Sequence, residues 1–317
     1  MSTAETMKGP HGHDYGPVAQ ALRECGPEPI IYVPNPGNAG DGLIALGTYI
    51  LFEKLGISWQ IGRSDGVYPD RSVVYGGGGS LIELYPRAID FLKSNHPVCR
   101  RLVLLPHTIR AFGDVIAAMD DRCTLFARDK DSHAYLSGLG GTARTGLGHD
   151  MAFMISRDDL VSRRLDPGFL SRPGIRIAWL KMVTKILWHL RFRDSRLHAM
   201  RGDREAPGGD LPAANFDLSA MFSSGHLNGV SDAHMSPAAC ATTAKILQLI
   251  LERASLVETN RLHIAVLSAV LGRNLVMRDN SYGKNRGVYD HSMKDVFPDI
   301  AFQAEEAAGA RALSQGR

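Results

Sequence analysis

Short apolar runs alternate with longer segments of helical periodicity along this sequence. Each apolar run is bounded by Gly, Pro or polar residues, as buried strands are, and the longer segments repeat their apolar residues at helical spacing. Such alternation is typical of α/β domains built around a parallel sheet. In the first half the expected strands are IIYVP (30–34), SVVY (72–75), RLVLLP (101–106), CTLFA (123–127) and HDMAFMI (149–155), and the first long expected helix is GLIALGTYILFEKLG (42–56).

The second half of the chain shows the same alternation. Ser236 and Pro237 open a helical segment in the way that an N-cap residue and a first-turn proline do. A charged stretch rich in Gly and Pro, residues 191–215, precedes it and predicts an exposed loop outside the core. The later expected elements are the strand SLVET (255–259), the helix NRLHIAVLSAVLG (260–272) and the strand NLVMRDN (274–280).

The length of 317 residues suits two domains rather than one hydrophobic core. We expect two Rossmann-like, doubly wound α/β domains with a cleft between them. The first covers residues 1–155. The second covers residues 156–317 and carries an irregular insertion near 191–230.

Composition and charge exclude several classes of protein. The net charge of +3 is too small to predict a nucleic-acid partner. The four cysteines form no CxxC pair, which predicts reduced thiols and no zinc site. The N-terminal stretch lacks the basic and apolar regions of a signal peptide, and no segment has about 20 uninterrupted apolar residues. We therefore expect a cytoplasmic protein with no metal and no nucleic-acid partner.

Four consecutive glycines, Gly76–Gly79, follow the SVVY run and precede Ser80 and a stretch of helical character. Glycine loses the most conformational freedom on folding, so a run of four indicates that the backbone closely approaches a ligand or takes angles that side chains disfavour. A tight turn from strand to helix is the alternative, although one or two glycines ordinarily suffice for it.

Polar motifs follow the other expected strands as well. In α/β sheets, ligands bind beyond the carboxyl ends of the strands, where helix N-termini attract anions. The glycine spacing does not match a dinucleotide fingerprint or a P-loop, and the chain has no nucleophile elbow or H-E-x-x-H motif. The motifs that follow strands are NPGNAGDGL (35–43), PHT (106–108), ARDKDS (127–132), TNRLH (259–263) and DNSYGKN (279–285).

Taken in order, these motifs resemble those of the polysaccharide pyruvyl transferases. The resemblance spans about residues 30–290 and is carried by NAGD (38–41), GGGGSL (76–81), RDKDS (128–132), GHDMAF (148–153), RLH (261–263) and DNSYGKN. It implies transfer of the carboxyvinyl group of phosphoenolpyruvate to two hydroxyls of one sugar, which forms a pyruvate ketal. The implied acceptor is a sugar or a lipid-linked glycan, and phosphoenolpyruvate is the donor substrate, with no cofactor or metal.

The resemblance also implies a fold and a separate substrate for each domain. The fold is similar to that of the two-domain GT-B glycosyltransferases, with the ligands in the interdomain cleft. Residues 1–155 are then expected on the acceptor side, and residues 156–317 on the phosphoenolpyruvate side.

Four side chains are expected to carry the chemistry. Arg261 is the expected clamp for phosphoenolpyruvate, because a guanidinium binds carboxylate or phosphate oxygens with two hydrogen bonds. His263 is the expected general acid or base, and His107 and Asp41 are further candidates for proton transfer. Arg261 and His263 share one site only if the helix begins at this point. The structural alternatives are a helix-capping arginine, core histidines and a first-turn acid.

Further residues are expected around these four. Lys284 and Asn280 would close over the anion, although DNSYGKN is equally typical of a turn. Arg128 and Asp129 are additional candidates, with a helix cap and a structural ion pair as the alternative. The loop residues expected to shape the site are Asn38, Gly40, Gly76, Gly77, Gly78, Gly79 and Ser80.

The segment from Ile175 to Arg193 has a separate pattern. As a helix, it places Lys181 and Lys185 opposite an apolar face. A basic amphipathic helix can lie in a membrane interface, so contact with the inner face of a membrane is one interpretation. Packing of the apolar face on the domain is the other. The residues of that apolar face are Trp179, Met182, Val183, Ile186 and Leu190.

Two other functions fit the same sequence. A nucleotide-sugar glycosyltransferase of the GT-B type would bind a nucleoside diphosphate and would not depend on phosphoenolpyruvate. A non-catalytic protein that binds a phosphorylated ligand would bind without turnover, and His263→Ala would leave its cellular role intact.

Overall fold

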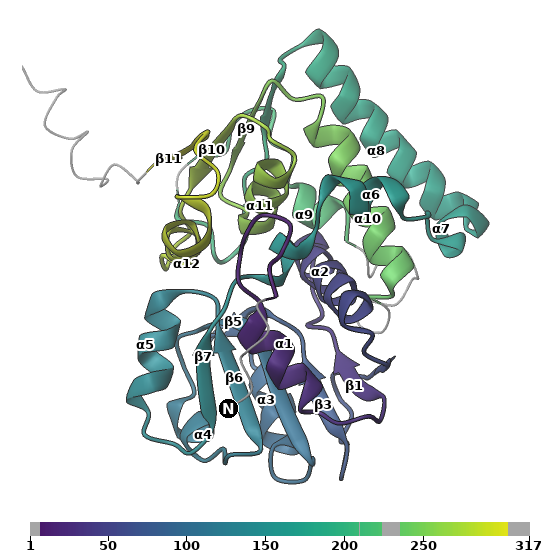
Figure 1. Ribbon diagram of the computed structural model, residues 1–317. Helices are drawn as coiled ribbons and strands as arrows, with labels where there is room; N and C mark the ends of the chain where they lie inside the picture. Colours follow the sequence, from purple (N-terminus) through teal and green to yellow (C-terminus); the bar gives the residue numbers. More distant parts are fainter. Residues whose placement is uncertain (1–6, 209, 224–234, 304–317) are drawn as a thin grey trace, which may run out of the picture.

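The computed structural model describes residues 7–208, 210–223 and 235–303, whose strands form two parallel sheets (Figure 1). The first sheet has the order β2-β1-β3-β5-β6-β7, and β4 also pairs with β5. Its strands are β1 (Ile30–Val33), β2 (Trp59–Ile61), β3 (Ser72–Tyr75), β4 (Gly78–Leu81), β5 (Arg101–Ile109), β6 (Cys123–Ala127) and β7 (Arg144–Leu147). The mixed α/β class with parallel sheets, predicted from the alternation, is confirmed.

The second sheet has the order β11-β10-β9-β8, and all its pairs are parallel. Ser236 caps α10 by accepting a hydrogen bond from the Ala239 amide, with Pro237 at the first helical position as expected. The strands are β8 (Arg196–His198), β9 (Leu256–Thr259), β10 (Leu275–Arg278) and β11 (Ile300–Gln303).

The helices lie around both sheets. Those of the first half are α1 (Gly16–Arg23), α2 (Ala39–Leu55), α3 (Arg87–Asn95), α4 (Gly113–Ala117), α5 (Lys130–Gly138) and the 3₁₀ helix η1 (Met151–Met154). Those that follow are α6 (Arg157–Ser162), α7 (Pro167–Ser171), α8 (Pro173–Phe192), α9 (Leu218–Met221), α10 (Pro237–Leu251), α11 (Leu262–Val270), α12 (Lys284–Val288) and the π-helical turn η3 (Tyr289–Met293).

Two expected elements are wrong. The last two glycines of the run form strand β4 with Ser80 and Leu81, and helix α3 begins only at Arg87. Strand β5 pairs with β3 along its first half and with β4 along its second half. The two strands therefore follow one another along the same edge of β5, and the glycine run lies where one ends and the other begins. The segment HDMAFMI forms η1 rather than a strand, because a short apolar run does not distinguish a buried strand from a buried helical turn.

The loop expected over residues 191–215 also differs. It contains β8, and two of its charged residues, Arg201 and Glu205, are buried. Their burial is tolerated because each pairs with an opposite charge. Residue 209 and residues 224–230 of the expected insertion lie outside the described residues.

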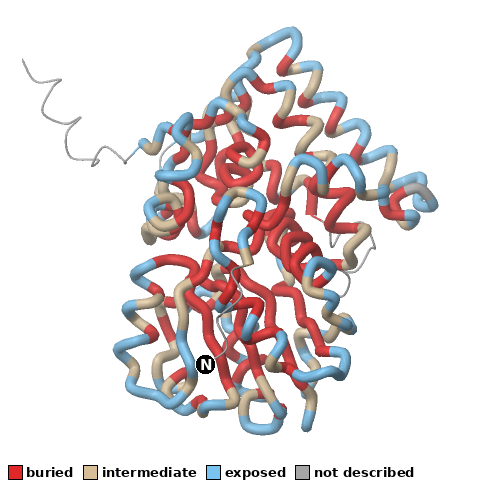
Figure 2. Tube along the Cα trace, in the orientation of Figure 1, coloured by how far each residue is buried: buried red, intermediate tan, exposed pale blue. Residues whose placement is uncertain are grey.

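Helix α2 lies between the two sheets in Figure 1 and packs against α10, α11 and η1. Nearly all of its first fourteen residues are buried, and the buried segments gather around it in Figure 2. The Tyr49 hydroxyl of α2 donates to the Met235 carbonyl, just before α10. The helix ends at Gly56, whose φ of +65° allows the left-handed cap that was expected from the sequence. One hydrophobic cluster therefore includes residues of both halves of the chain.

Close packing of α2 on η1 depends on Gly47. A Cβ at this position would lie 1.8 Å from the Met151 carbonyl oxygen, so a larger residue must push two backbones apart. We expect Gly47→Ala to lower the free energy of unfolding by about 1–3 kcal/mol, measured by urea denaturation. The matched control is Gly138→Ala in α5, where a Cβ meets open space and costs nothing. Equal stability of the two variants would contradict the packing described.

Residues 7–15 form a small antiparallel loop held by a bridge between Lys8 and Asp14. From this loop, the His11 ring contacts the Ile155 carbonyl, and the His13 ring contacts the Ser292 carbonyl at 2.7 Å. Burial lowers the pKa of His13, so the ring is held in its neutral form. The loop thus joins residues that lie far apart in the sequence.

No helix in the described part of the chain combines the length and the apolar character that crossing a lipid bilayer requires.

Candidate functional site

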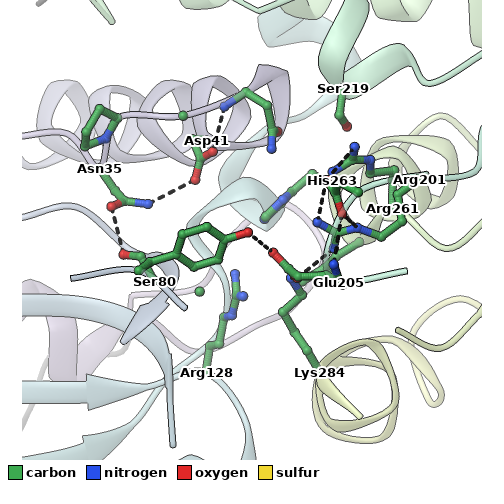
Figure 3. A pocket seen from close by; sticks show the side chains of 17 residues that line it. Asn35, Asp41, Ser80, Arg128, Arg201, Glu205, Ser219, Arg261, His263 and Lys284 are labelled. Atoms are coloured by element: carbon green, nitrogen blue, oxygen red, sulfur yellow. Dashed lines mark hydrogen bonds and ion pairs between the residues drawn. The ribbon is translucent and has the colours of Figure 1, made fainter. Parts of the chain in front are cut away.

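A small polar pocket of about 180 Å³ lies where loops of the first sheet meet loops of the second (Figure 3). Its walls come from β4 itself and from the segments after β1, β4, β6, β8, β9 and β10. Charged and polar side chains dominate the lining. The lining residues are Asn35, Pro36, Gly37, Asn38, Asp41, Gly79, Ser80, Tyr85, Arg128, Arg201, Asp203, Glu205, Ser219, Arg261, Leu262, His263 and Lys284.

The N-termini of two helices open at this pocket. Asn38 caps α2 by accepting from the Gly40 amide at 2.8 Å, and Asp41 returns the interaction by accepting from the Asn38 amide at 2.9 Å. Arg261 is the N-cap residue of α11 and has extended backbone angles, whereas His263 lies in the first helical turn. The chain therefore turns between the two side chains, and both line the pocket. Helix N-termini present free amides and a positive dipole, which favour an anion.

The glycine run has two separate causes. A Cβ at either of the first two glycines would lie 2.7 Å from backbone atoms, the amide nitrogen of Asn35 or the carbonyl oxygen of Pro106. Gly78 has a φ of +154° and lies against the Asn35 side chain. The fourth, Gly79, lines the pocket, and a Cβ there would lie 2.8 Å from Nη2 of Arg128. Close packing within the fold thus requires three glycines, and the pocket itself requires one.

A buried ion pair stands behind His263. The Arg128 guanidinium donates to Asp150 at 2.6 Å, and both side chains are 1% exposed. Nε2 of His263 lies 3.2 Å from the same carboxylate oxygen. Burial alone would raise the pKa of Asp150, but His263 and Arg128 hold it well below its ordinary value. Because an ionised carboxylate only accepts hydrogen bonds, Nε2 must carry the proton of that bond.

Glu205 is the centre of a second network. Its carboxylate accepts from Nη1 of Arg201 at 2.7 Å, from Nζ of Lys284 at 2.6 Å and from the Tyr85 hydroxyl at 2.8 Å. Burial would raise the pKa of Glu205, but Lys284 and Arg201 hold it well below its ordinary value. Burial lowers the pKa of Lys284 to about 8, against the opposing effect of Glu205. Tyr85 follows β4 of the first sheet, whereas Glu205 follows β8 of the second. The hydrogen bond between them therefore joins the two sides of the pocket wall.

The Arg261 guanidinium is also oriented by carboxylates. Its Nε donates to Asp217 at 2.9 Å, and its Nη2 lies 3.0 Å from Asp203 and also donates to Asp217. The side chain is only 7% exposed, and these bonds to Asp217 and Asp203 hold the guanidinium in place in the pocket wall. Figure 3 shows Arg261, Arg201 and Lys284 on the same side of the pocket, with Ser80 and Asp41 opposite.

The structure brings many of the expected residues into one pocket. Those of the lining are Asn38, Asp41, Gly79, Ser80, Arg128, Arg261, His263 and Lys284.

Other expected residues lie behind the pocket wall. His107 is fully buried, and its Nε2 accepts from the Ser80 amide at 2.9 Å. Burial and then the Arg128 charge lower the pKa of His107 to about 3, so the ring stays neutral and holds Ser80 of β4 in place. Asp129 caps α5 and pairs with Arg110, which is the structural alternative considered for it.

The remaining expected residues also support the wall without lining it. Asn280 accepts from the Lys284 amide and donates to Glu205. A Cβ at Gly40 would lie 2.7 Å from Nδ1 of His263, so this glycine allows the histidine ring to approach α2. Gly76, Gly77 and Gly78 act through the packing described above.

Several lining residues were not among the sequence candidates. Asn35 lies two residues after the end of β1, and this place near a strand end is a signal that the sequence contains. Its amide donates to Asp41 at 3.0 Å, and its carbonyl oxygen accepts from Ser80. Arg201 and Glu205 follow β8. The sequence does not predict this strand, because the residues around it are charged and typical of a loop.

Within the described ranges, no three His, Cys, Asp or Glu side chains are grouped to hold a metal ion. The four cysteines, all within the described residues, are buried and form no disulfide.

Comparison with known proteins identifies the family. Residues 38–282 match the family of polysaccharide pyruvyl transferases. Among solved structures, the chain is similar to "a functional uncharacterized protein KP1_0663 from Klebsiella pneumoniae subsp. pneumoniae NTUH-K2044", with 24% sequence identity and a TM-score of 0.70. The likeness covers 91% of this chain and 96% of that one, and it concerns the fold alone. No curated protein matches the chain. Because the family match covers most of the sequence, the resemblance noted in its motifs is confirmed: the chain belongs to the polysaccharide pyruvyl transferase family.

Proposed function

We propose that this protein forms a pyruvate ketal on a sugar, with phosphoenolpyruvate as donor. In this reaction, two hydroxyl oxygens of the sugar form bonds to the second carbon of phosphoenolpyruvate, and the bond from that carbon to the phosphate oxygen breaks. One hydroxyl proton is balanced by the proton that converts the methylene carbon to a methyl group, and the other by the proton on the released phosphate. No oxidant or reductant is needed.

The convergence of three cations on a small pocket carries this proposal. Arg201, Arg261 and Lys284 come from three loops of the second sheet, and each is held by a carboxylate partner. Phosphoenolpyruvate presents a phosphate and a carboxylate, which guanidinium groups bind with two hydrogen bonds each. The volume of about 180 Å³ is below the roughly 300–1,000 Å³ of drug-sized ligand sites, which suits a small anion better than a nucleotide sugar.

Proton transfer has two candidates in the pocket wall. With Nε2 of His263 donating to Asp150, Nδ1 is the ring nitrogen that gains or gives a proton during turnover. Asp41 lies across the pocket, and burial raises the pKa of its carboxyl above the ordinary value. A carboxylate with a raised pKa is a better base toward a sugar hydroxyl.

The proposed architecture follows the family resemblance. We assign residues 1–155 and 156–317 to two domains in a GT-B-like arrangement, with the pocket in the cleft between them. Residues on the first-sheet side would bind the acceptor, which is a sugar or a lipid-linked glycan. The second domain would bind phosphoenolpyruvate, and the reaction would take place in the cytoplasm.

Ligand-dependent thermal unfolding tests the donor without an acceptor. A ligand that binds only the folded state stabilises it by about 2.7 kcal/mol at a concentration of 100 Kd. We expect phosphoenolpyruvate to raise the Tm, and Arg261→Ala to abolish the rise. The sequence offers a matched control, because RLH also occurs at residues 196–198, where Arg196 is exposed on β8. Arg196→Ala should retain the full shift.

Other outcomes would change the conclusion. A rise with uridine or guanosine diphosphate and none with phosphoenolpyruvate would favour a nucleotide-sugar glycosyltransferase. A rise with phosphoenolpyruvate and no phosphate release with any sugar or lipid-linked acceptor would favour the non-catalytic alternative. Loss of the shift in Arg196→Ala as well would show that the effect of Arg261→Ala is not local.

A further inference from the structure

Helix α8 has two different apolar faces. The face expected from the sequence to be apolar, around Trp179, Val183, Ile186 and Leu190, is buried in the protein. It packs toward α7 and α10, so it is not available to a membrane. The hypothesis that this face contacts lipid is therefore wrong.

The opposite face carries large apolar side chains that are open to solvent. Ile177, Leu180, Trp188 and Phe192 are 49%, 52%, 49% and 67% exposed. Three of them line one shallow depression together with Lys181, Thr184 and Lys185. Figure 1 shows α8 at the edge of the molecule beside α10, and Figure 2 shows exposed positions recurring along its whole length. Scattered apolar residues are ordinary on a surface, whereas four on one helix face form a patch.

The charge of this helix is of one sign. Residues 172–193 contain no Asp or Glu, and their cations are Arg172, Arg176, Lys181, Lys185, Arg191 and Arg193.

The cations are interleaved with the exposed apolar side chains. The Arg193 guanidinium lies over the Trp188 ring at 5.2 Å, and the Arg191 guanidinium lies 5.6 Å from the Phe192 ring. Aromatic rings beside basic groups are the combination that interfacial helices use at the level of lipid headgroups.

We propose that the outer face of α8 binds an anionic membrane surface. Ile177, Leu180, Trp188 and Phe192 would enter the boundary between headgroups and acyl chains, and the cations would contact lipid phosphates. Charge selects this partner over a second copy of the chain, because two copies of the face would bring like charges together. The inference stands apart from the proposed enzymatic function, since none of these residues lines the pocket described.

Sedimentation of the full chain with vesicles tests the proposal. We expect binding to vesicles of phosphatidylcholine and phosphatidylglycerol in a 3:1 ratio, little binding to phosphatidylcholine alone, and weaker binding at high salt. Lys181→Glu combined with Lys185→Glu should weaken binding about tenfold or more. Trp188→Ser combined with Phe192→Ser should have a similar effect. Quenching of Trp188 by brominated lipid, absent in Trp188→Phe, would place this ring in the bilayer.

Matched variants elsewhere on the surface provide the controls. Lys54→Glu combined with Lys93→Glu makes the same change of net charge on exposed positions of α2 and α3 and should leave vesicle binding unchanged.

Three outcomes would overturn the proposal. They are absence of vesicle binding by the unaltered chain, equal loss in the control pair, and a dimer without vesicle binding that dissociates in the Trp188 and Phe192 variant. The last would assign the face to a second copy. An unchanged Tm of each variant shows that it is folded.

Discussion

Replacing His263 by alanine is expected to lower the turnover number about 10²- to 10⁴-fold, the usual contribution of a positioned general acid or base. The binding of phosphoenolpyruvate should change little, because Arg201, Arg261 and Lys284 keep their carboxylate partners. Asp150 also keeps the Arg128 guanidinium and the Ala152 amide. The variant should therefore fold and still show the thermal shift with phosphoenolpyruvate. Phosphate release in the presence of an acceptor measures the loss.

The second RLH tripeptide supplies the control for this variant also. His198 lies on β8, is partly buried and faces Glu258 at 3.2 Å, as His263 faces Asp150. His198→Ala should keep nearly full turnover. A turnover number within a factor of ten of the unaltered protein in His263→Ala would remove the histidine from the proton-transfer step. The Asp41 carboxyl would then remain as the candidate in the pocket wall.

Arg128→Met is expected to lower the free energy of unfolding by about 3–5 kcal/mol, the cost of leaving a buried charge without its partner. Methionine fills a similar volume but leaves Asp150 without the guanidinium that donates at 2.6 Å. Urea denaturation measures the effect. The control is Arg63→Met, which breaks a 2.7 Å ion pair with Asp65 whose members are 72% and 69% exposed. That change should leave the free energy of unfolding nearly unchanged, because solvent screens the pair.

Removing the carboxylate together with the arginine provides a stricter test. In Arg128→Met combined with Asp150→Asn, no charge of the pair remains, so we expect much of the stability to return. The free energies of unfolding lost in the two single variants are then compared with the loss in the double variant. If the two single losses add up to the double loss, the two residues act independently. The uncompensated charge of Asp150 is then not the cause of the loss.

Much of the fold follows from local signals in the sequence. Ser236 caps α10 where expected, Asp129 caps α5 as its structural alternative proposed, and Gly56 ends α2. Each of these positions is set by hydrogen bonds or backbone angles within a few residues, which is why the sequence reveals them. The candidates in the pocket were found because motifs that follow parallel strands gather at one edge of a sheet.

The rest of the site depends on contacts between distant residues. Glu205 lies in a charged, Gly- and Pro-rich stretch that is typical of an exposed loop. It is buried because Tyr85 and Lys284, 120 and 79 residues away in the sequence, donate to it. Asp150 was noted within a family motif, but its place behind His263 depends on the 3₁₀ turn that it caps. Local sequence carries no trace of such pairings.

The loop of residues 7–15 has a consequence for how the chain folds during synthesis. His13 leaves the ribosome 279 residues before Ser292, the residue whose carbonyl it contacts in the folded protein. That contact cannot form until nearly the whole described chain has emerged, whereas the strands of the first sheet can pair much earlier. The His11 contact with the Ile155 carbonyl can form midway through synthesis, so the loop would dock in two stages, and the His13 contact would mark the completion of folding.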